Sequence, residues 1–167
     1  MAGPHTLAET ERTAESRIGD LDLDFRALSV VSNLFRAANA VRNHMESTVL
    51  AKSDLTWTAF VVLWIAWIWG EAETRVIAEE SGVSKATLSG VLNTLEKRGL
   101  AERKRSDEDG RLVLVSLTPS GTRLIKRLFP EINRQEQAAV SGLSQRQQEM
   151  AADFLRELVL ATGHPEG

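Results

Sequence analysis

The sequence contains no cysteine among its 167 residues. Without thiols the chain forms no disulfide, offers zinc no thiolate ligand and has no cysteine nucleophile. A redox switch based on sulfur would therefore have to use methionine.

Long apolar runs are also missing. The longest, residues 60–69, is far shorter than the ~20 residues that a membrane-spanning helix needs. The N-terminus lacks the basic and then apolar segments of a secretory signal. We therefore expect a cytoplasmic protein without membrane association.

Signatures of catalysis and of metal binding are absent as well. The three histidines, His5, His44 and His164, show no ligand spacing. The sequence has no glycine loop for phosphate and no Gly-x-Ser-x-Gly elbow. We expect no enzyme activity, no metal and no cofactor.

The charge is distributed unevenly along the chain. The net charge is −3, but residues 1–24 hold six acidic and two basic side chains, which is a balance of −4. Residues 84–111 hold seven basic and five acidic side chains. Local basic clusters, rather than the charge of the whole chain, determine whether a protein binds nucleic acid. We read residues 1–24 as an acidic flexible tail.

A long amphipathic helix is predicted after this tail. Apolar residues recur every three or four positions from Phe25 to Val49, which is typical of a helix with a seam that faces a partner. Arg42 interrupts this seam. A further helix over residues 57–69 is capped by Asp54 or Thr56. Its predicted apolar stripe consists of Trp57, Phe60, Val61, Trp64 and Ile68.

Two shorter helices follow, separated by a turn. A helix over residues 74–80 stops at Ser81-Gly82, and Ser84 caps the next helix, which ends at Gly99. This order predicts a helix-turn-helix.

The apolar period then changes from about 3.6 to two. Residues 101–105 and 111–117 are predicted to form a hairpin with a charged tip. A helix begins at Thr118-Pro119 and is either interrupted or bent at Pro130 before it continues to Val140. The last helix begins at Ser144.

A helix-turn-helix followed by a basic hairpin predicts a winged helix that binds duplex DNA. Small, amide and basic side chains on the outer helix face suit base edges and phosphates. The candidate DNA-binding residues are Ser84, Lys85, Thr87, Ser89, Asn93 and Lys97 on the helix, and Arg103, Arg105 and Arg111 on the hairpin. A solvated helix face beside a charged loop would give a similar pattern.

These segments resemble the MarR (multiple antibiotic resistance regulator) family of bacterial transcription factors. The resemblance rests on residues 83–89 (VSKATLS), 92–100 (LNTLEKRGL), 109–111 (DGR) and 115–121 (VSLTPSG). It covers about residues 25–161. The turn before the DGR segment is acidic here, whereas the family often has proline.

The resemblance implies a homodimer whose N- and C-terminal helices interdigitate and whose winged helices bind a palindromic operator. It implies that Arg111 enters the minor groove and that Asp109 positions the wing by pairing with Arg103 or a nearby helix residue. Asp109 could also serve simply as a turn former.

The family is commonly controlled by small aromatic or phenolic acids. Arg42 shares the spacing of the apolar residues of the seam, so its side chain should point at the seam. A charge in such a place needs a partner. That partner could be an anionic ligand, a glutamate of the other subunit, or solvent reached by the long side chain. The candidate ligand-binding residues are Arg42, Arg36, His44, Trp57 and Trp64.

We therefore predict a mostly α fold, a winged helix-turn-helix with a two-stranded wing and a helical dimerisation region. The DNA-binding domain spans residues 54–118, and residues 25–53 and 119–163 form the dimerisation region. The predicted function is a DNA-binding transcriptional regulator, most often a repressor, released by a small ligand. The alternative is a winged helix that binds an acidic protein partner, since a fold does not determine function.

Overall fold

The computed structural model describes residues 5–107 and 109–163, and it consists of two compact units, residues 1–44 and 45–167. The chain is mostly helical. Its elements are α1 (Leu7–Ile18), α2 (Phe25–Thr48), η1 (Leu50–Ser53), α3 (Trp57–Trp69), β1 (Glu71–Glu73), α4 (Thr74–Ser81), α5 (Lys85–Lys97), β2 (Ala101–Arg105), β3 (Val113–Leu117), α6 (Pro119–Ala139) and α7 (Gln145–Thr162).

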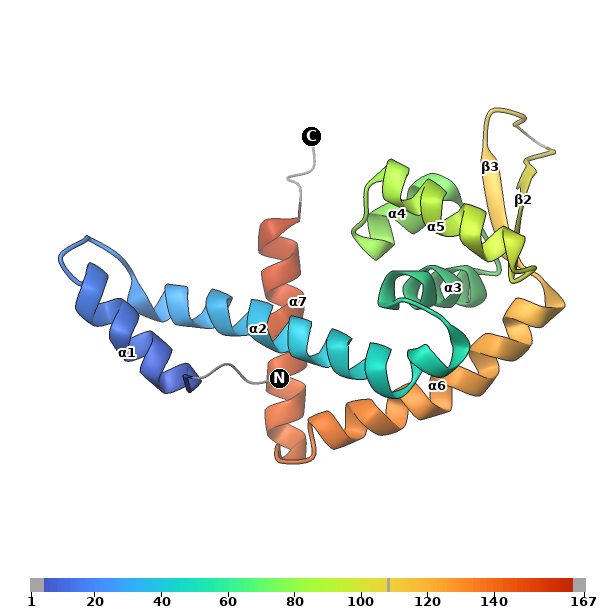
Figure 1. The fold of residues 1–167 in the computed structure, drawn as a ribbon. Helices are drawn as coiled ribbons and strands as arrows, with labels where there is room; N and C mark the ends of the chain where they lie inside the picture. The colour runs from blue at the N-terminus through green and yellow to red at the C-terminus, as the bar shows by residue number, and fades with distance from the viewer. Residues whose placement is uncertain (1–4, 108, 164–167) are drawn as a thin grey trace. The chain divides into compact units, whose positions relative to one another are not determined.

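The second unit contains a winged helix. Helix α3 packs against α4, α5, α6 and β3, and the β2–β3 hairpin projects beside α5 (Figure 1). Fully buried side chains from several of these elements meet in one core, among them Leu63, Ile77, Leu92, Val115 and Ile125. This core fixes how α5 and the hairpin lie with respect to each other.

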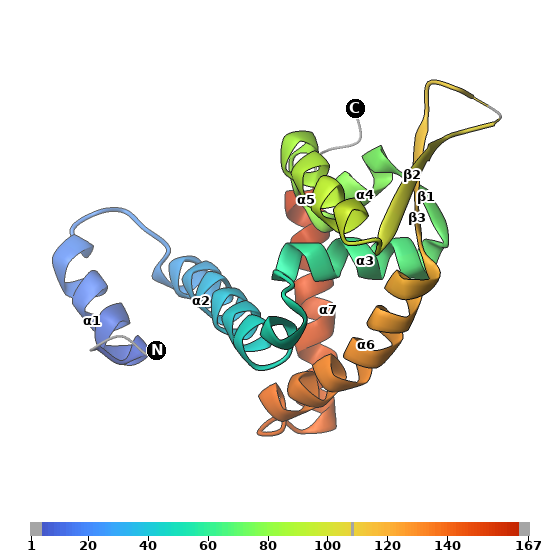
Figure 2. The same cartoon turned by 45° about the vertical axis from the view of Figure 1, so that its right-hand side comes forward.

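The predicted two-stranded wing is present as β2 and β3, and a third strand that the sequence did not predict joins the same sheet. Strand β1 pairs antiparallel with β3, and the strand order is β1-β3-β2 (Figure 2). Ala72 is buried opposite Val115, while both flanking glutamates of β1 are at least partly exposed. Strand β1 has only three residues, two of which are glutamates, so its strand propensity is low. The strand can be recognised only from its pairing with β3.

The predicted apolar stripe of α3 is partly wrong. Phe60 is buried, but Ile68 is 51% exposed, and Leu63 and Ala66 contribute to the core instead. Thr56, one of the two predicted caps, accepts a hydrogen bond from the Ala59 N–H (3.2 Å). Helix α3 is apolar on every side, so its periodicity does not identify the face that packs inward.

Helix α6 runs without interruption through Pro130. Thr118 caps it by accepting a hydrogen bond from the Gly121 N–H (3.1 Å). A Cβ at Gly121 would lie 1.9 Å from the carbonyl oxygen of Leu100, so glycine permits the close approach of α6 to the end of the helix-turn-helix.

Residues 7–18 form a helix, which corrects the prediction of an unstructured tail for this part of residues 1–24. Thr6 and Glu9 make a capping box, in which each side chain accepts a hydrogen bond from the other's backbone N–H. The backbone and side-chain hydrogen bonds from Thr6 lower the pKa of Glu9. This local signal outweighs the low apolar content of the segment.

Helix α7 begins as predicted, after the Ser144 cap. None of its residues, all of which lie in the described part of the chain, is buried. Met150, Phe154 and Val159 are among its exposed apolar side chains. Within residues 5–107 and 109–163, no helix is both long and apolar enough to cross a membrane.

Candidate nucleic-acid interface

Helix α5 exposes one face because the other belongs to the core. Gly82 adopts a left-handed conformation (φ 64°), which ends α4 and turns the chain into α5. Leu88, Leu92 and Leu95 are buried. The polar side chains between them therefore point outward.

The predicted helix residues all lie on this outward face. Lys85, Ser89, Asn93 and Lys97 are exposed. Ser84 is exposed too, but its hydroxyl oxygen accepts a hydrogen bond from the Thr87 N–H (3.1 Å) and lies 2.9 Å from the Thr87 hydroxyl. Ser84 and Thr87 thus hold the start of the helix in place.

Arg103 links the hairpin to α5. Its Nη2 donates hydrogen bonds to Asn93 Oδ1 (2.6 Å) and to Glu96 Oε2 (2.5 Å), and Glu96 Oε1 accepts a hydrogen bond from the Arg103 N–H (3.1 Å). The hydrogen bond from Arg103 lowers the pKa of Glu96. The resemblance implied that Asp109 pairs with Arg103 or with a nearby helix residue, but the ion pair of Arg103 among the described residues is with Glu96.

Asp109 instead organises the tip of the wing. Its Oδ1 accepts a hydrogen bond from the Arg111 N–H (3.0 Å), and its carbonyl oxygen accepts one from the Leu112 N–H (2.9 Å). The Ser106 N–H donates to the carbonyl of Leu112 (3.0 Å) and closes the hairpin. The side chains of Arg105 and Arg111 are exposed.

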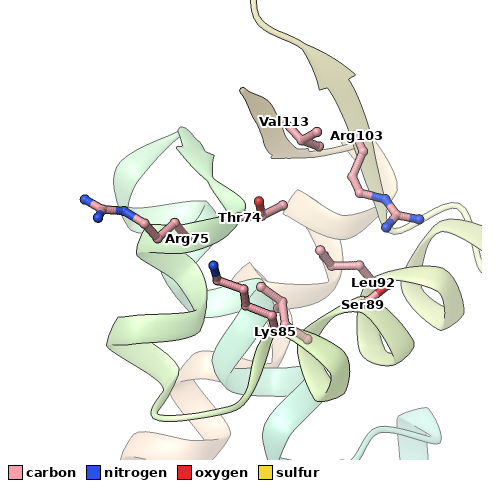
Figure 3. Close-up of a pocket in the computed structure, with 8 residues that line it drawn as sticks. Thr74, Arg75, Lys85, Ser89, Leu92, Arg103 and Val113 are labelled. Atoms are coloured by element: carbon pink, nitrogen blue, oxygen red, sulfur yellow. The ribbon is translucent and has the colours of Figure 1, made fainter. Parts of the chain in front are cut away.

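A cavity of about 320 Å³ lies between α4, α5 and the hairpin. In Figure 3, Lys85 rises from α5 toward Thr74, and Arg103 extends from β2 toward α5. Arg75 lines the same cavity and pairs with Glu79 (Nε–Oε1 3.7 Å). Arg75 was not among the predicted DNA-binding residues, although its place at the start of the first helix of the motif is visible in the sequence.

The three predicted ligand-binding residues of the first unit, Arg36, Arg42 and His44, have surroundings that differ from one another. Arg42 is exposed, and its Nη2 donates a hydrogen bond to Asn39 Oδ1 (2.8 Å) on the same helix. Arg36 lines a hollow of about 530 Å³ between α1 and α2, and its Nη1 is buried without a hydrogen-bond partner among the described residues. His44 is exposed on α2.

In the second unit, Trp57 and Trp64 contact other aromatic rings. Trp64 stacks on Phe129 of α6, with ring centroids 4.1 Å apart and an interplanar angle of 8°. Trp57 lies 5.6 Å from Phe60, and its backbone N–H donates to Glu46 Oε1 (2.7 Å). Both tryptophans are half-buried, and they stabilise the packing of α3.

Comparisons with known proteins match the segment that contains this surface. The model of the MarR family matches residues 55–113, which include the helix-turn-helix and most of the hairpin. The HTH-type transcriptional regulator YwaE of Bacillus subtilis is 41% identical over 136 residues, which are 81% of this chain and 80% of that protein.

Solved structures share both the fold and part of the sequence. BpsR of Bordetella bronchiseptica, whose DNA binding is regulated by 6-hydroxynicotinic acid, superimposes with a TM-score of 0.71 at 28% identity, covering 77% of this chain and 97% of BpsR. MepR of S. aureus, solved as a complex with DNA, gives a TM-score of 0.70 at 25% identity, covering 78% of this chain and 96% of MepR. These relatives are regulators rather than enzymes.

Proposed function

The chain belongs to the MarR family of transcriptional regulators, and we propose that it is a homodimeric repressor that binds a palindromic operator. The observation that carries this proposal is the outward face of α5 beside a wing whose tip exposes Arg111. The helix face suits the major groove, and a wing arginine suits the narrow minor groove. Binding to chromosomal DNA would place the protein in the cytoplasm of a bacterium.

The DNA-contacting residues in this proposal are those with exposed polar or basic side chains. Lys85, Ser89 and Asn93 contact base edges, while Lys97 and Arg105 contact phosphates. Ser84 and Thr87 position the helix through the cap that they form. Arg103 positions the hairpin against α5 and reaches DNA only by leaving Glu96.

Asp109 acts through Arg111 in this proposal. Its carboxylate holds the Arg111 backbone N–H and so orders the tip before DNA arrives. A second carboxylate close to the tip, Asp107, repels phosphate and limits affinity.

Dimerisation is supported by apolar side chains that one chain leaves exposed. Leu28, Val31 and Phe35 of α2 are at least 41% exposed, and α7 has several similar residues. Apolar faces of this extent mark protein interfaces. A two-fold dimer would present two copies of α5 to major grooves about one helical turn, ~34 Å, apart.

The salt dependence of DNA affinity tests the DNA-binding part of the proposal. The probe is a labelled duplex taken from the sequence that flanks the protein's own gene. We expect log affinity to fall linearly with log salt concentration, by ~0.9 for each phosphate contact. Affinity for this duplex that does not exceed affinity for a scrambled duplex would contradict operator binding and favour a protein partner.

We also propose that an aromatic or phenolic acid releases the repressor. The regulation of BpsR by 6-hydroxynicotinic acid, an aromatic carboxylate, supports this class of effector. Arg36 is the stronger of the two arginine candidates, because its buried Nη1 lacks a partner in the described chain, whereas Arg42 binds Asn39. The Arg36 side chain as a whole is half-buried, and a ligand carboxylate would accept a hydrogen bond from its buried Nη1.

A small panel of acids tests the effector. Benzoate, salicylate and 6-hydroxynicotinate should raise the melting temperature and lower DNA affinity. Arg36→Ala should abolish both responses and spare DNA binding without ligand, and Arg42→Ala serves as the matched variant. If no acid acts on the wild-type protein, the effector proposal is wrong, while the operator proposal is unaffected.

A further inference from the structure

A second basic surface lies in the winged-helix unit, away from the outward face of α5. It is a hollow of about 540 Å³ formed by η1, the end of α5 and the first turns of α6. Its polar lining consists of Lys52, Ser53, Arg98, Ser120, Arg123 and Arg127. Four of these six residues are cations, in a chain whose net charge is −3.

Neutral oxygens hold the arginines of this basic hollow in place. Arg98 donates from Nη2 to the carbonyl oxygen of Ser53 (2.7 Å), and Arg127 donates from Nη2 to Ser53 Oγ (3.3 Å). Arg123 donates from Nη2 to Ser120 Oγ (2.9 Å). These bonds orient the guanidinium groups but leave their charge uncompensated.

Carboxylates do not neutralise the cluster. Across residues 5–107 and 109–163, no ion pair joins any of its four cations to an acidic side chain. Arg123 and Arg127 are also four residues apart on α6, where like charges repel and destabilise a helix. The remaining guanidinium N–H groups suit the oxygens of phosphate and carboxylate groups.

We propose that the basic hollow binds a small anion that carries two or more negative charges on phosphate or carboxylate groups. The four cations that line it are exposed, so an anion can reach their N–H groups from solvent. The bound anion contacts η1, α5 and α6 together, so it stabilises the packing of α6 on the winged helix. This site is separate from the hollow lined by Arg36, which lies in the other unit.

Duplex DNA also carries phosphates, but the position of the basic hollow argues against DNA as the anion that it binds. The hairpin projects from its base near the start of α6, and α6 runs in the other direction (Figures 1 and 2). The hollow is lined by residues of η1, of α6 and of the segment that follows α5. Lys85, Asn93 and the wing tip do not contribute to its lining. DNA that contacts these three places does not need the hollow.

Titration calorimetry of the full chain with sodium pyrophosphate tests the proposal. Sodium chloride of equal ionic strength is the reference. We expect saturable binding of pyrophosphate, weaker binding of inorganic phosphate, and a higher melting temperature with pyrophosphate than with chloride. Arg123→Gln and Arg127→Gln should each weaken pyrophosphate binding about two- to fivefold.

Lys126→Gln is the matched control, because it removes one exposed charge from the same helix outside the lining. It should bind pyrophosphate like the wild type. A pyrophosphate response equal to that of chloride, or an equal loss in Lys126→Gln, would overturn the proposal. A loss of DNA affinity in Arg123→Gln and Arg127→Gln without added anion would show that the cluster contacts DNA, and would overturn it too.

Discussion

Arg111 is the residue whose loss should affect DNA binding most selectively. Its side chain is exposed at the wing tip, and its backbone N–H donates a hydrogen bond to Asp109 Oδ1. Arg111→Ala should therefore weaken binding by about 1–3 kcal/mol and leave the melting temperature unchanged. Fluorescence anisotropy on operator DNA and thermal denaturation measure the two quantities.

Lys126→Ala provides the control for this substitution, since it removes an exposed cation from α6. It should retain wild-type affinity. Wild-type affinity in the Arg111→Ala protein, or an equal loss in both variants, would mean that the wing does not contact DNA.

Glu96 predicts a pH dependence of stability. Arg103 lowers its pKa, so the ion pair stabilises the folded chain above the ordinary glutamate range and is lost as the pH falls through the lowered pKa. Glu96→Gln should cost up to about 1 kcal/mol at pH 7, because the pair is partly exposed. The difference from wild type should shrink as the pH falls through the lowered pKa of Glu96 and vanish below it. Denaturation experiments at several pH values measure this difference in the free energy of unfolding. If the difference stays constant as the pH is lowered, the charge of Glu96 is not its source.

The exposure of the proposed DNA-binding residues was easier to predict from the sequence than the contacts that they make within the chain. Exposed positions on α5 follow from helical periodicity, so Lys85, Ser89 and Asn93 were predictable. The contact of Arg103 with Glu96 was not, because it joins β2 to α5 at a geometry that only the packed sheet determines. The pairing of Asp109 with Arg103 was one of two that the family resemblance implied, and the ion pair of Arg103 in the described chain is with Glu96 instead.

At the scale of elements, Gly90 affects both the stability of α5 and the surface of α5 that we propose contacts DNA. Gly90 is exposed in mid-helix, and a Cβ there would meet nothing within 4 Å. Gly90→Ala should raise the free energy of unfolding by about 0.5–1 kcal/mol, because alanine favours the helix. The added methyl should also weaken operator binding by keeping α5 from base edges.

Thermal denaturation and anisotropy on the same preparation measure these opposite changes. A more stable protein with unchanged or tighter DNA binding would show that the Gly90 face does not approach the bases.

Elements with strong local signals were predicted well, and the others depended on tertiary contacts. The strand β2 and the caps of α5 and α7 follow from alternation and from Ser84 and Ser144. Strand β1 has little strand propensity and forms by pairing with β3. Helix α3 is apolar all round, so its inward face was chosen wrongly. Pro130 leaves α6 continuous because surrounding residues such as Leu128 and Ile132 are buried.

At the scale of the whole molecule, the exposed apolar residues of α2 and α7 predict an obligate dimer. Sedimentation at micromolar concentration should give the mass of two chains, and truncation after Gly142, which removes α7, should abolish the dimer and lower stability. A monomeric full-length chain, or a stable dimer of the truncated chain, would contradict this assembly.

The central claim is that two winged helices of a dimer bind one palindromic operator. Hydroxyl-radical footprinting on the DNA that flanks the gene tests it most directly. We predict two protected segments related by two-fold symmetry and centred about one helical turn, ~34 Å, apart, with minor-groove protection lost in Arg111→Ala. A single unsymmetrical segment, or no protection where the protein is folded and dimeric, would contradict the account.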